Sequence, residues 1–381
     1  MSGAIKVLFV SEVSGFAGGV ERYLFHTAGL LRRNGFEVDG TFEKTARGSA
    51  VFEAEFDRVL PWGAPDALPG GYDLVMVHKL RSARYLEALE CRFKVAVMVH
   101  DHEYFCPRFC KYFPFTRRNC HRRYRRWFCG VCGMLRGPEG KPPLELLKYR
   151  FIEFPRLAGA VLAADKLAVL SDFMAKELEK DGACRGKIKL VHPCVPVAAP
   201  AVPAAGEPPH IVCSGQLIRG KGFDLLLAAL SELGGEWVAD ILGDGKDREL
   251  LKAQAAELGD RVRFHGWVSD PEKYYRAATL AVLPWRWQEP FGLVGPEALA
   301  YSLPLAGFAV GGFGEYLIDG ITGIVVRPGE VRGLTVAMRE LLDNPEKARR
   351  FGANGRRLVE DRFSEQRLVA SFEALAREMN E

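Results

Sequence analysis

Short apolar runs alternate with stretches of helical period along most of the chain. The runs have the length of buried strands, and between them apolar residues recur every three or four positions, as on the buried face of a helix. The predicted strands are Val7–Val10, Leu74–Val77, Val95–Val99, Leu167–Leu170, Ile211–Cys213, Val238–Leu242, Val262–Phe264 and Leu280–Leu283. Such alternation predicts parallel sheets covered by helices, and therefore an α/β protein.

Helices are predicted between these strands. The first lies around Val20–Leu31, where apolar side chains fall on one face and Gly35 follows as a stop signal. The others are Phe223–Leu233, Arg248–Leu258, Leu334–Leu342 and a last helix near Ser364–Met379.

A proline-rich segment divides the chain. Val195–Pro209 contains five prolines and has no helical or strand period, so it is the best candidate for a linker. We therefore predict an N-terminal domain over 1–195, a linker over 196–209, a C-terminal domain over 210–363 and a final helix over 364–381, whose packing partner stays open. Two doubly wound domains joined this way would face each other across a cleft, with ligands beyond the carboxyl ends of the strands.

The composition is that of an ordinary globular protein. With 381 residues, 48% of them apolar and 26% charged, the chain suits two domains with cores of their own. These values exclude disordered, collagen-like and coiled-coil classes. The net charge of +4 favours no class of anionic partner. No apolar stretch approaches the roughly 18–20 residues that span a bilayer, and the first residues lack a secretory pattern, so we expect a cytoplasmic protein.

Three glycine-rich junctions, Ser14–Gly19, Gly215–Gly222 and Gly243–Gly245, follow predicted strands. Glycine lets backbone N–H groups approach a phosphate, and a following helix start favours negative charge. None has the spacing of the dinucleotide fingerprint or of the P-loop, and a tight turn is the simpler interpretation of each alone. Arg219 and Lys221 favour a role for the second junction, because two cations could hold a diphosphate without a metal.

The segment Glu289–Glu297 combines two carboxylates with a predicted helix start. Pro290 and Gly292 keep Glu289 in a loop, and Pro296 suits the first turn of a helix. Carboxylates accept hydrogen bonds from hydroxyls, and the N–H groups of a helix start suit phosphate oxygens. The segment is a candidate site for a sugar nucleotide, with a capping carboxylate beside a surface carboxylate as the simpler alternative.

On these motifs the chain resembles the family 4 glycosyltransferases of GT-B fold. The resemblance implies transfer of a sugar from a nucleotide-sugar donor, with retention of the anomeric configuration and without a catalytic metal. The matching segments are Glu289–Glu297 with Phe291-Gly292-Leu293 inside it, Phe264–Val268, Asp319–Gly323, Gly18–Glu21 and His100-Asp101.

The resemblance also implies individual roles. His100, Lys221 and Glu289 form the predicted catalytic set: His100 contacts the sugar, Lys221 neutralises the diphosphate and Glu289 binds sugar hydroxyls. Glu297 holds the ribose. The other predicted donor-binding residues are Gly18, Gly19, Gly215, Arg219, Gly243, Phe291, Gly292 and Leu293. Gln216 stands where the family usually has Arg, and we hypothesise that Arg219 substitutes for it.

The chain offers no dedicated nucleophile, since both matching glutamates have binding roles. We therefore expect front-face attack by an acceptor hydroxyl rather than a double displacement. The expected reaction moves a hexosyl or N-acetylhexosaminyl group to a lipid-linked or polysaccharide acceptor in cell-envelope glycan synthesis. The alternatives are a sugar-nucleotide epimerase of the same fold and a nucleic-acid-binding protein.

Residues 102–136 form a cysteine-rich insert that the general fold does not need. Cys129 and Cys132 have the spacing of half a tetrahedral zinc site. The resemblance to some family members implies Cys106, Cys120, Cys129 and Cys132 as the ligands. Four thiolates leave no open position, so the expected zinc is structural. An iron–sulfur centre and free buried cysteines are the alternatives.

The insert is also basic and aromatic. Between Tyr104 and Phe128 there are eight Lys or Arg residues and no Asp or Glu. Such a segment suits an anionic membrane or single-stranded nucleic acid, and a solvated face is the simpler interpretation. Given the enzyme interpretation, we expect 104–128 to dock a lipid-linked or anionic glycan acceptor. This implies peripheral contact with the inner face of the membrane and no nucleic acid. The oligomeric state stays open.

Overall fold

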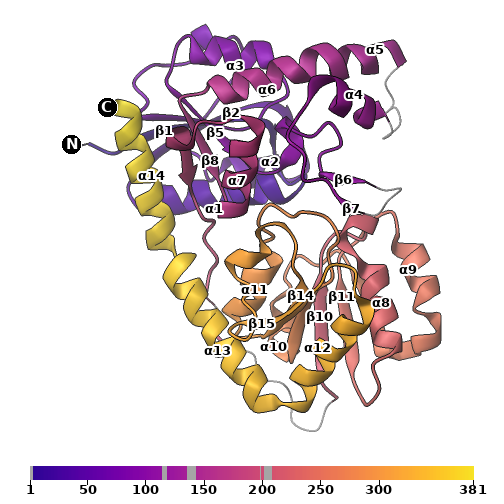
Figure 1. The fold of residues 1–381 in the computed structure, drawn as a ribbon. Coiled ribbons are helices and arrows are strands. Elements are labelled where there is room, and N and C mark those ends of the chain that lie inside the picture. Colours follow the sequence, from indigo (N-terminus) through magenta and orange to yellow (C-terminus); the bar gives the residue numbers. More distant parts are fainter. Residues whose placement is uncertain (1–2, 114–117, 135–142, 198, 201–207) are drawn as a thin grey trace. The chain divides into compact units, whose positions relative to one another are not determined.

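The computed structural model describes residues 3–113, 118–134, 143–197, 199–200 and 208–381. They form two compact units (Figure 1). The first unit comprises Met1–Tyr112, Cys120–Cys194 and Glu365–Glu381, and the second comprises Phe113–Asn119 and Val195–Ser364. Of the predicted linker over 196–209, positions 198 and 201–207 lie outside the described residues.

The first unit is built on a seven-stranded parallel sheet. Its strands, in spatial order, are β3 (Arg58–Leu60), β2 (Glu37–Thr45), β1 (Lys6–Ser14), β4 (Leu74–Lys79), β5 (Val95–Val99), β8 (Lys166–Val169) and β9 (Ile188–Leu190). The helices around it are α1 (Gly19–Arg33), α2 (Ser49–Glu53), α3 (Ala83–Glu90), α6 (Phe154–Ala163), α7 (Asp172–Asp181) and α14 (Glu365–Asn380). Both faces of β1 are buried, since Leu8 and Val10 join the core with α3, α6 and α7 while Phe9 contacts Phe56 and Phe372.

The second unit is built on a six-stranded parallel sheet. Its strands, in spatial order, are β12 (Val262–Gly266), β11 (Val238–Leu242), β10 (His210–Ser214), β13 (Leu280–Leu283), β14 (Leu305–Phe308) and β15 (Gly323–Val326). Its helices are α8 (Phe223–Ser231), α9 (Arg248–Gln254), α10 (Glu272–Ala277), α11 (Val294–Ala300), α12 (Val331–Asp343) and α13 (Pro345–Arg362). The eight predicted strands are confirmed, with ends shifted by a few residues.

Each sheet is doubly wound. In the first, strand order reverses between β1 and β4, and in the second between β10 and β13. The connections that leave two such strands run in opposite directions, which opens a crevice beyond their carboxyl ends. The structure therefore confirms the predicted α/β class, and it directs attention to the loops that follow β10 and β13.

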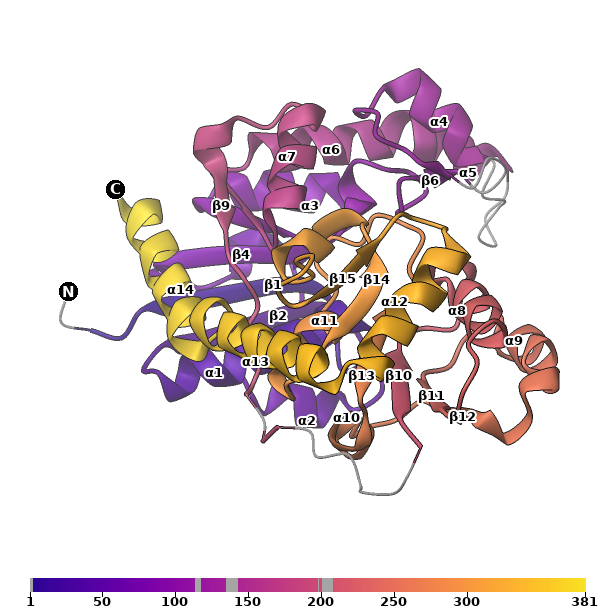
Figure 2. The ribbon, with the colours of Figure 1, turned by 60° about the horizontal axis from the view of Figure 1, so that its bottom comes forward.

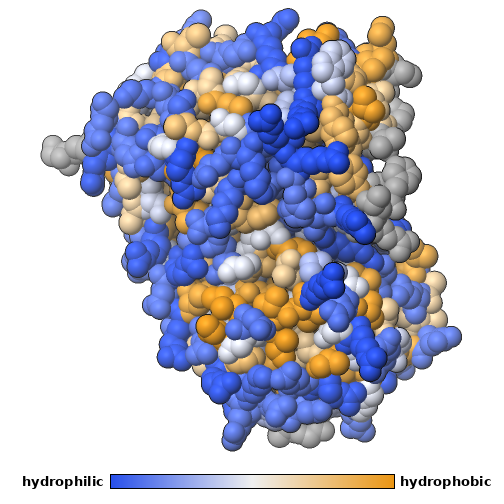
Figure 3. All heavy atoms as spheres, in the orientation of Figure 1, coloured by the Kyte–Doolittle hydropathy of each residue, from blue (hydrophilic) through white to orange (hydrophobic). Residues whose placement is uncertain are grey.

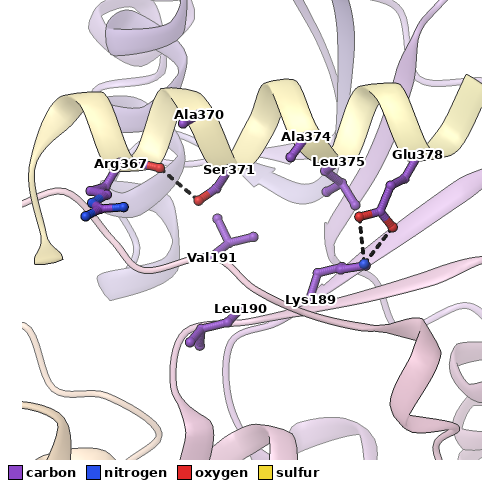
Figure 4. Close-up of a pocket in the computed structure, with 9 residues that line it drawn as sticks. All are labelled: Lys189, Leu190, Val191, Arg367, Ala370, Ser371, Ala374, Leu375 and Glu378. Atoms are coloured by element: carbon purple, nitrogen blue, oxygen red, sulfur yellow. Dashed lines mark hydrogen bonds and ion pairs between the residues drawn. The ribbon is translucent and has the colours of Figure 1, made fainter.

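The C-terminal helix α14 packs on the first unit, where it contacts α1 and β4 (Figure 2). Glu378 accepts hydrogen bonds from Lys166 and Lys189, which lie on β8 and β9. A cavity of about 260 Å³ lies between α14 and residues 189–191, and small side chains such as Ala370 and Ala374 line it (Figure 4). Among the described residues no helix combines the length and the apolar character needed to cross a bilayer.

The cysteine-rich insert is attached through a buried ion cluster. Lys111 is 3% exposed, and its Nζ lies 2.9 Å from Glu177 Oε2 and 2.9 Å from Asp181 Oδ2 on α7. Asp181 also accepts a hydrogen bond from the backbone N–H of Tyr124. Two segments of the insert, around residues 111 and 124, are thus fixed to one helix of the sheet domain.

After this attachment the chain becomes mainly helical. The insert contains a small two-stranded sheet of β6 (Tyr112–Phe113) and β7 (Arg118–Asn119), and then α4 (Arg126–Met134). Helix α5 (Pro143–Lys148) continues through a π-helical turn (Tyr149–Glu153) into α6. Insert positions 114–117 and 135–136 lie outside the described residues.

Candidate active site

The second unit brings Lys221 and Glu289 into contact at the crevice of its sheet. Lys221 ends a short turn after β10, and Glu289 lies in the loop after β13. Lys221 Nζ is 2.9 Å from Glu289 Oε2, and both side chains are largely buried. Since β10 and β13 are the strands between which the order reverses, this pair occupies the place where ligands bind in such sheets.

Two tryptophans complete the surroundings of Lys221. Its Nζ lies 3.3 Å from the ring centroid of Trp285 and 5.5 Å from that of Trp287, so the ammonium group faces aromatic π-electrons. Trp287 Nε1 also donates a hydrogen bond to Glu289 Oε2. Burial lowers the pKa of Lys221, and the Glu289 carboxylate offsets part of this effect. Neither tryptophan belongs to a sequence motif, although both lie within four residues of the end of a predicted strand.

Arg286 fixes the loop after β13 to the glycine junction after β10. Its guanidinium group pairs with Asp224 and donates to the carbonyl oxygen of Arg219, and its backbone N–H donates to the carbonyl oxygen of Gly220. The Arg219 side chain is exposed. The proposed substitution of Arg219 for Gln216 stays a prediction.

Glu297 lies in the first turn of α11, which begins at Val294 and ends at Ala300. The buried hydroxyl of Tyr316 lies in the electrostatic field of Glu297 and Glu289. Burial and the negative charges of Glu289, Glu297 and Glu315 raise the pKa of Tyr316 well above its usual value.

Tyr316 also determines the shape of the loop between the two carboxylates. Its hydroxyl lies 2.7 Å from the carbonyl oxygen of Phe291 and 2.9 Å from that of Gly292. Gly292 has a φ of +81°, and a Cβ there would lie 2.9 Å from the tyrosine oxygen. Glycine is therefore needed at this position for conformation and for space.

The second and third glycine junctions are in direct contact. A Cβ on Gly243 would lie 1.9 Å from the carbonyl oxygen of Gly215, and the N–H of Gly215 donates to the carbonyl oxygen of Leu242. The predicted donor-binding residues Gly215, Gly243, Lys221, Glu289 and Glu297 therefore belong to one region of the second unit.

Three of the predicted residues, Gly18, Gly19 and His100, belong to the first unit, whereas Arg219, Phe291, Gly292 and Leu293 belong to the second. His100 directly follows β5, and its Nε2 lies 3.1 Å from Nδ1 of His78 on β4. Burial, together with the positive charge of Lys79, lowers the pKa of His100 to about 3. His100 is therefore a neutral hydrogen-bonding group at neutral pH. His78 is thus its direct hydrogen-bonding partner.

Gly18 and Gly19 lie at the start of α1, after the carboxyl end of β1. A charged cluster lies at the ends of the neighbouring strands: Glu103 pairs with both Lys79 and Arg81. Burial alone would lower the pKa of Lys79, but the carboxylates of Glu103, Asp101 and Glu21 raise it. The sequence analysis missed this cluster because isolated charges at strand ends form no motif.

The four predicted metal ligands, Cys106, Cys120, Cys129 and Cys132, are all free cysteines in the described part of the chain. Burial raises the pKa of the Cys129 thiol, and the charges of Cys106, Cys120 and Cys132 raise it further. Backbone N–H groups of Arg108, Cys110 and Lys111 donate to the sulfur of Cys106. Within the described part of the chain, no three His, Cys, Asp or Glu side chains have the arrangement of a metal site, so the zinc site stays a prediction.

Two doubly wound parallel-sheet units define the GT-B class of fold, and solved structures of that class match nearly the whole chain. Sucrose-phosphate synthase of Thermosynechococcus elongatus has a TM-score of 0.73 and 22% identity, covering 98% of this chain and 99% of that chain. HepE of Anabaena, solved in complex with UDP, has a TM-score of 0.73 and 17% identity, covering 98% and 100%. The predicted GT-B fold is confirmed.

The similarity in sequence concerns mainly the second unit. Residues 198–358 match the family model described as Glycosyl transferases group 1. The lipopolysaccharide core biosynthesis mannosyltransferase LpcC of Rhizobium leguminosarum bv. viciae is 34% identical over 201 residues, which are 49% of this chain and 56% of that protein. The chain spans about half the length of the curated relatives it matches.

The loop geometry predicts a difference between two glycine substitutions. Gly292 and Gly320 both have positive φ, +81° and +71°, so alanine strains the backbone at either position by about 1–2 kcal/mol. At Gly292 the added Cβ also meets Phe313 and Tyr316, whereas at Gly320 it meets open space. We expect Gly292→Ala to lower the free energy of unfolding by at least about 1 kcal/mol more than Gly320→Ala. Parallel thermal melts measure this difference, and equal losses would contradict the packing argument.

Proposed function

We propose that this protein is a glycosyltransferase of the group 1 family that transfers a sugar from a nucleotide sugar to a hydroxyl group. The Lys221–Glu289 pair at the ends of β10 and β13 is the observation that supports it most directly. Both residues lie inside the segment that matches the family model. A cation suits the diphosphate of such a donor, and a carboxylate suits its hydroxyls.

Each residue has a distinct role in this proposal. Glu297 accepts hydrogen bonds from the ribose hydroxyls, and Glu289 accepts them from the transferred sugar. Lys221 stabilises the negative charge that develops on the leaving diphosphate, which a preorganised cation in a dry site does effectively. The remaining donor contacts come from Gly215, Arg219, Gly243 and Phe291–Leu293, and from Gly18, Gly19 and His100 of the first unit.

The proposed stereochemical course is retention, with front-face attack by the acceptor hydroxyl. Glu289 Oε2 is engaged by Lys221 Nζ and Trp287 Nε1, which suits a binding group better than a nucleophile. His100 is neutral, so it contributes hydrogen bonding near the sugar rather than positive charge. A trapped covalent glycosyl-enzyme would contradict this course.

The proposed acceptor is a lipid-linked or anionic glycan of the cell envelope, glycosylated at the cytoplasmic face of the membrane. The similarity to a lipopolysaccharide core mannosyltransferase supports this class of acceptor. It also favours transfer of a hexosyl or N-acetylhexosaminyl group. The epimerase and nucleic-acid alternatives gain no support from the comparisons.

A donor nucleotide sugar will stabilise the protein against heat. When the donor concentration is about 100 times its Kd, the expected stabilisation is about 2.7 kcal/mol. Glu297→Ala will abolish most of this stabilisation at the same donor concentration, because the ribose hydroxyls lose their hydrogen-bond acceptor. A thermal-shift panel of nucleotide sugars measures this. Glu346→Ala, an exposed glutamate on α13, is the matched control.

A nucleotide-release assay with the donor that stabilises the protein separates the enzyme classes. A transferase releases nucleotide faster when acceptor is added, whereas an epimerase converts the nucleotide sugar into its epimer and does not respond to an acceptor. If no nucleotide sugar shifts the melting temperature of the wild-type protein, the proposed function is wrong.

Donor binding will weaken as the pH rises, because Lys221 loses its proton. This loss will begin at a lower pH than it would if Lys221 had the pKa of an ordinary lysine. Burial depresses the pKa of Lys221, so rising pH removes its proton, and with it the charge that holds the diphosphate, below the usual range. The measurement is KM for the donor as a function of pH, which should rise on the alkaline side; we call this rise the alkaline limb. Lys221→Arg keeps its charge at every pH tested and should lose the alkaline limb, although the different geometry of arginine raises KM overall. An identical limb in both proteins would assign it to another group.

We also propose a structural zinc ion held by Cys106, Cys120, Cys129 and Cys132. The spacing of Cys129 and Cys132 supports it, since two cysteines separated by two residues form half of a tetrahedral zinc site. Backbone hydrogen bonds to Cys106 oppose the effect of burial on its pKa and would stabilise a thiolate there. Four thiolates would fix the insert without providing an open catalytic position.

Metal analysis of the purified protein should find stoichiometric zinc. Cys129→Ser and Cys132→Ser should lose it, because each removes one thiolate ligand. Cys184→Ser, at an exposed cysteine outside the insert, should retain it. Iron with sulfide would favour an iron–sulfur centre instead, and the absence of both metals would refute the proposal.

A further inference from the structure

Helix α4 buries its small residues and exposes its large apolar ones. Trp127, Phe128 and Val131 are 71%, 43% and 61% exposed, whereas Gly130 and Gly133 are buried. A Cβ on Gly130 would lie 2.5 Å from the ring of Phe151, and one on Gly133 would lie 2.9 Å from Pro107. The glycine side therefore packs closely on the protein. A surface helix of a globular protein usually has the opposite arrangement.

The following helix adds to the same apolar surface. Leu144 and Leu147 of α5 are 78% and 42% exposed, and Ile152 of the π-helical turn is 59% exposed. The rings of Trp127 and Phe151 lie 5.4 Å apart and join the two helices. Apolar atoms gather over this end of the first unit, at the upper right of Figure 3. We call Trp127, Phe128, Val131, Leu144, Leu147 and Ile152 the apolar face.

Arginines border the apolar face. Arg122, Arg123, Arg125 and Arg126 are exposed, and we call them the basic rim. The Arg122 guanidinium lies 4.5 Å from the ring centroid of Phe128, and that of Arg126 lies 5.6 Å from that of Trp127. Two exposed acidic residues lie nearby, Glu145 on α5 and Glu153 in the π-helical turn. Glu153 forms an ion pair with Lys148.

The start of the basic stretch 104–128 does not contribute the side chains of residues 104, 105, 111 and 112 to this surface. Tyr104, Phe105 and Tyr112 are buried, and Lys111 is paired within the ion cluster on α7. The expectation that 104–128 as a whole forms the docking surface is therefore corrected. The accessible surface comes from the basic rim and from the apolar face, which reaches Ile152.

We propose that the apolar face and the basic rim dock the protein onto an anionic lipid bilayer, with the apolar side chains at the level of the headgroups. Tryptophan suits this interfacial depth, and arginines attract anionic headgroups while their stems lie along apolar surface. Single-stranded nucleic acid fits less well. The aromatic rings could stack on bases, but Val131, Leu144, Leu147 and Ile152 have no ring for stacking. The inference deepens the proposed function, because a lipid-linked acceptor lies at the same bilayer.

Co-sedimentation with vesicles tests the proposal without using activity. The full chain should bind vesicles of phosphatidylcholine mixed with phosphatidylglycerol, and should bind pure phosphatidylcholine far more weakly. Arg122→Gln with Arg123→Gln should weaken binding to the mixed vesicles about thirty-fold, as expected for two cations near an anionic surface. Trp127→Ser should weaken it about ten-fold, and Trp127→Phe should restore most of the loss.

Matched controls lie on the second unit. Arg332→Gln with Arg349→Gln removes two exposed charges, and Val336→Ser removes an exposed apolar side chain from α12. Both should bind the mixed vesicles like the wild type. The proposal would be overturned if Trp127→Ser bound the mixed vesicles as tightly as the wild type. It would also be overturned if the wild type bound a single-stranded oligonucleotide more tightly than the vesicles.

The two proposals can fail separately. Vesicle binding by a protein that no nucleotide sugar stabilises would leave the docking surface standing and remove the proposed function. Transfer to a soluble acceptor by a protein that binds no vesicle would do the reverse.

Discussion

The buried contact between Lys221 and Glu289 constrains everything around it in the second unit. Two opposite charges removed from water lose much of their hydration, and a single contact at 2.9 Å repays this only when further partners complete the geometry. Trp285 and Trp287 supply them, and Arg286 holds their loop against the glycine junction. The pair therefore places a cation and a hydrogen-bond acceptor in a fixed geometry at the ends of β10 and β13. Under the proposed function, this is the preorganised charge that stabilisation of a leaving diphosphate requires.

A second buried ion cluster plays the corresponding part for the insert. Lys111 joins Glu177 and Asp181, and removal of one charged partner from such a cluster typically costs about 3–5 kcal/mol. Because Asp181 also accepts a hydrogen bond from the Tyr124 backbone, the parts of the insert around residues 111 and 124 share one anchor on α7.

Apolar runs were sufficient to predict the strands at the centre of both sheets, since buried parallel strands are apolar on both faces. The strands missed were those with polar or short sequences, such as Glu37–Thr45 at the side of the first sheet and Gly323–Val326 at the edge of the second. Glu289 and Glu297 could be predicted as candidate site residues because their spacing forms a motif. The contact of His78 with His100 could not, because it depends on the register of two strands that are distant in sequence.

The orientation of α4 could not be predicted for a related reason. Its sequence places glycines and large apolar residues on different sides, and by hydrophobicity alone the large side should face the core. Phe151 and Pro107 approach the glycines so closely that a Cβ has no room, so close packing determines which side is buried. The large side then remains exposed among arginines. Because α4 is held this way, the Trp127 side chain contributes little hydrophobic free energy of burial within its own chain. It can contribute more of this free energy only when it is buried in an external apolar phase. The exposed face is therefore better understood as one half of an interface than as an imperfectly packed core.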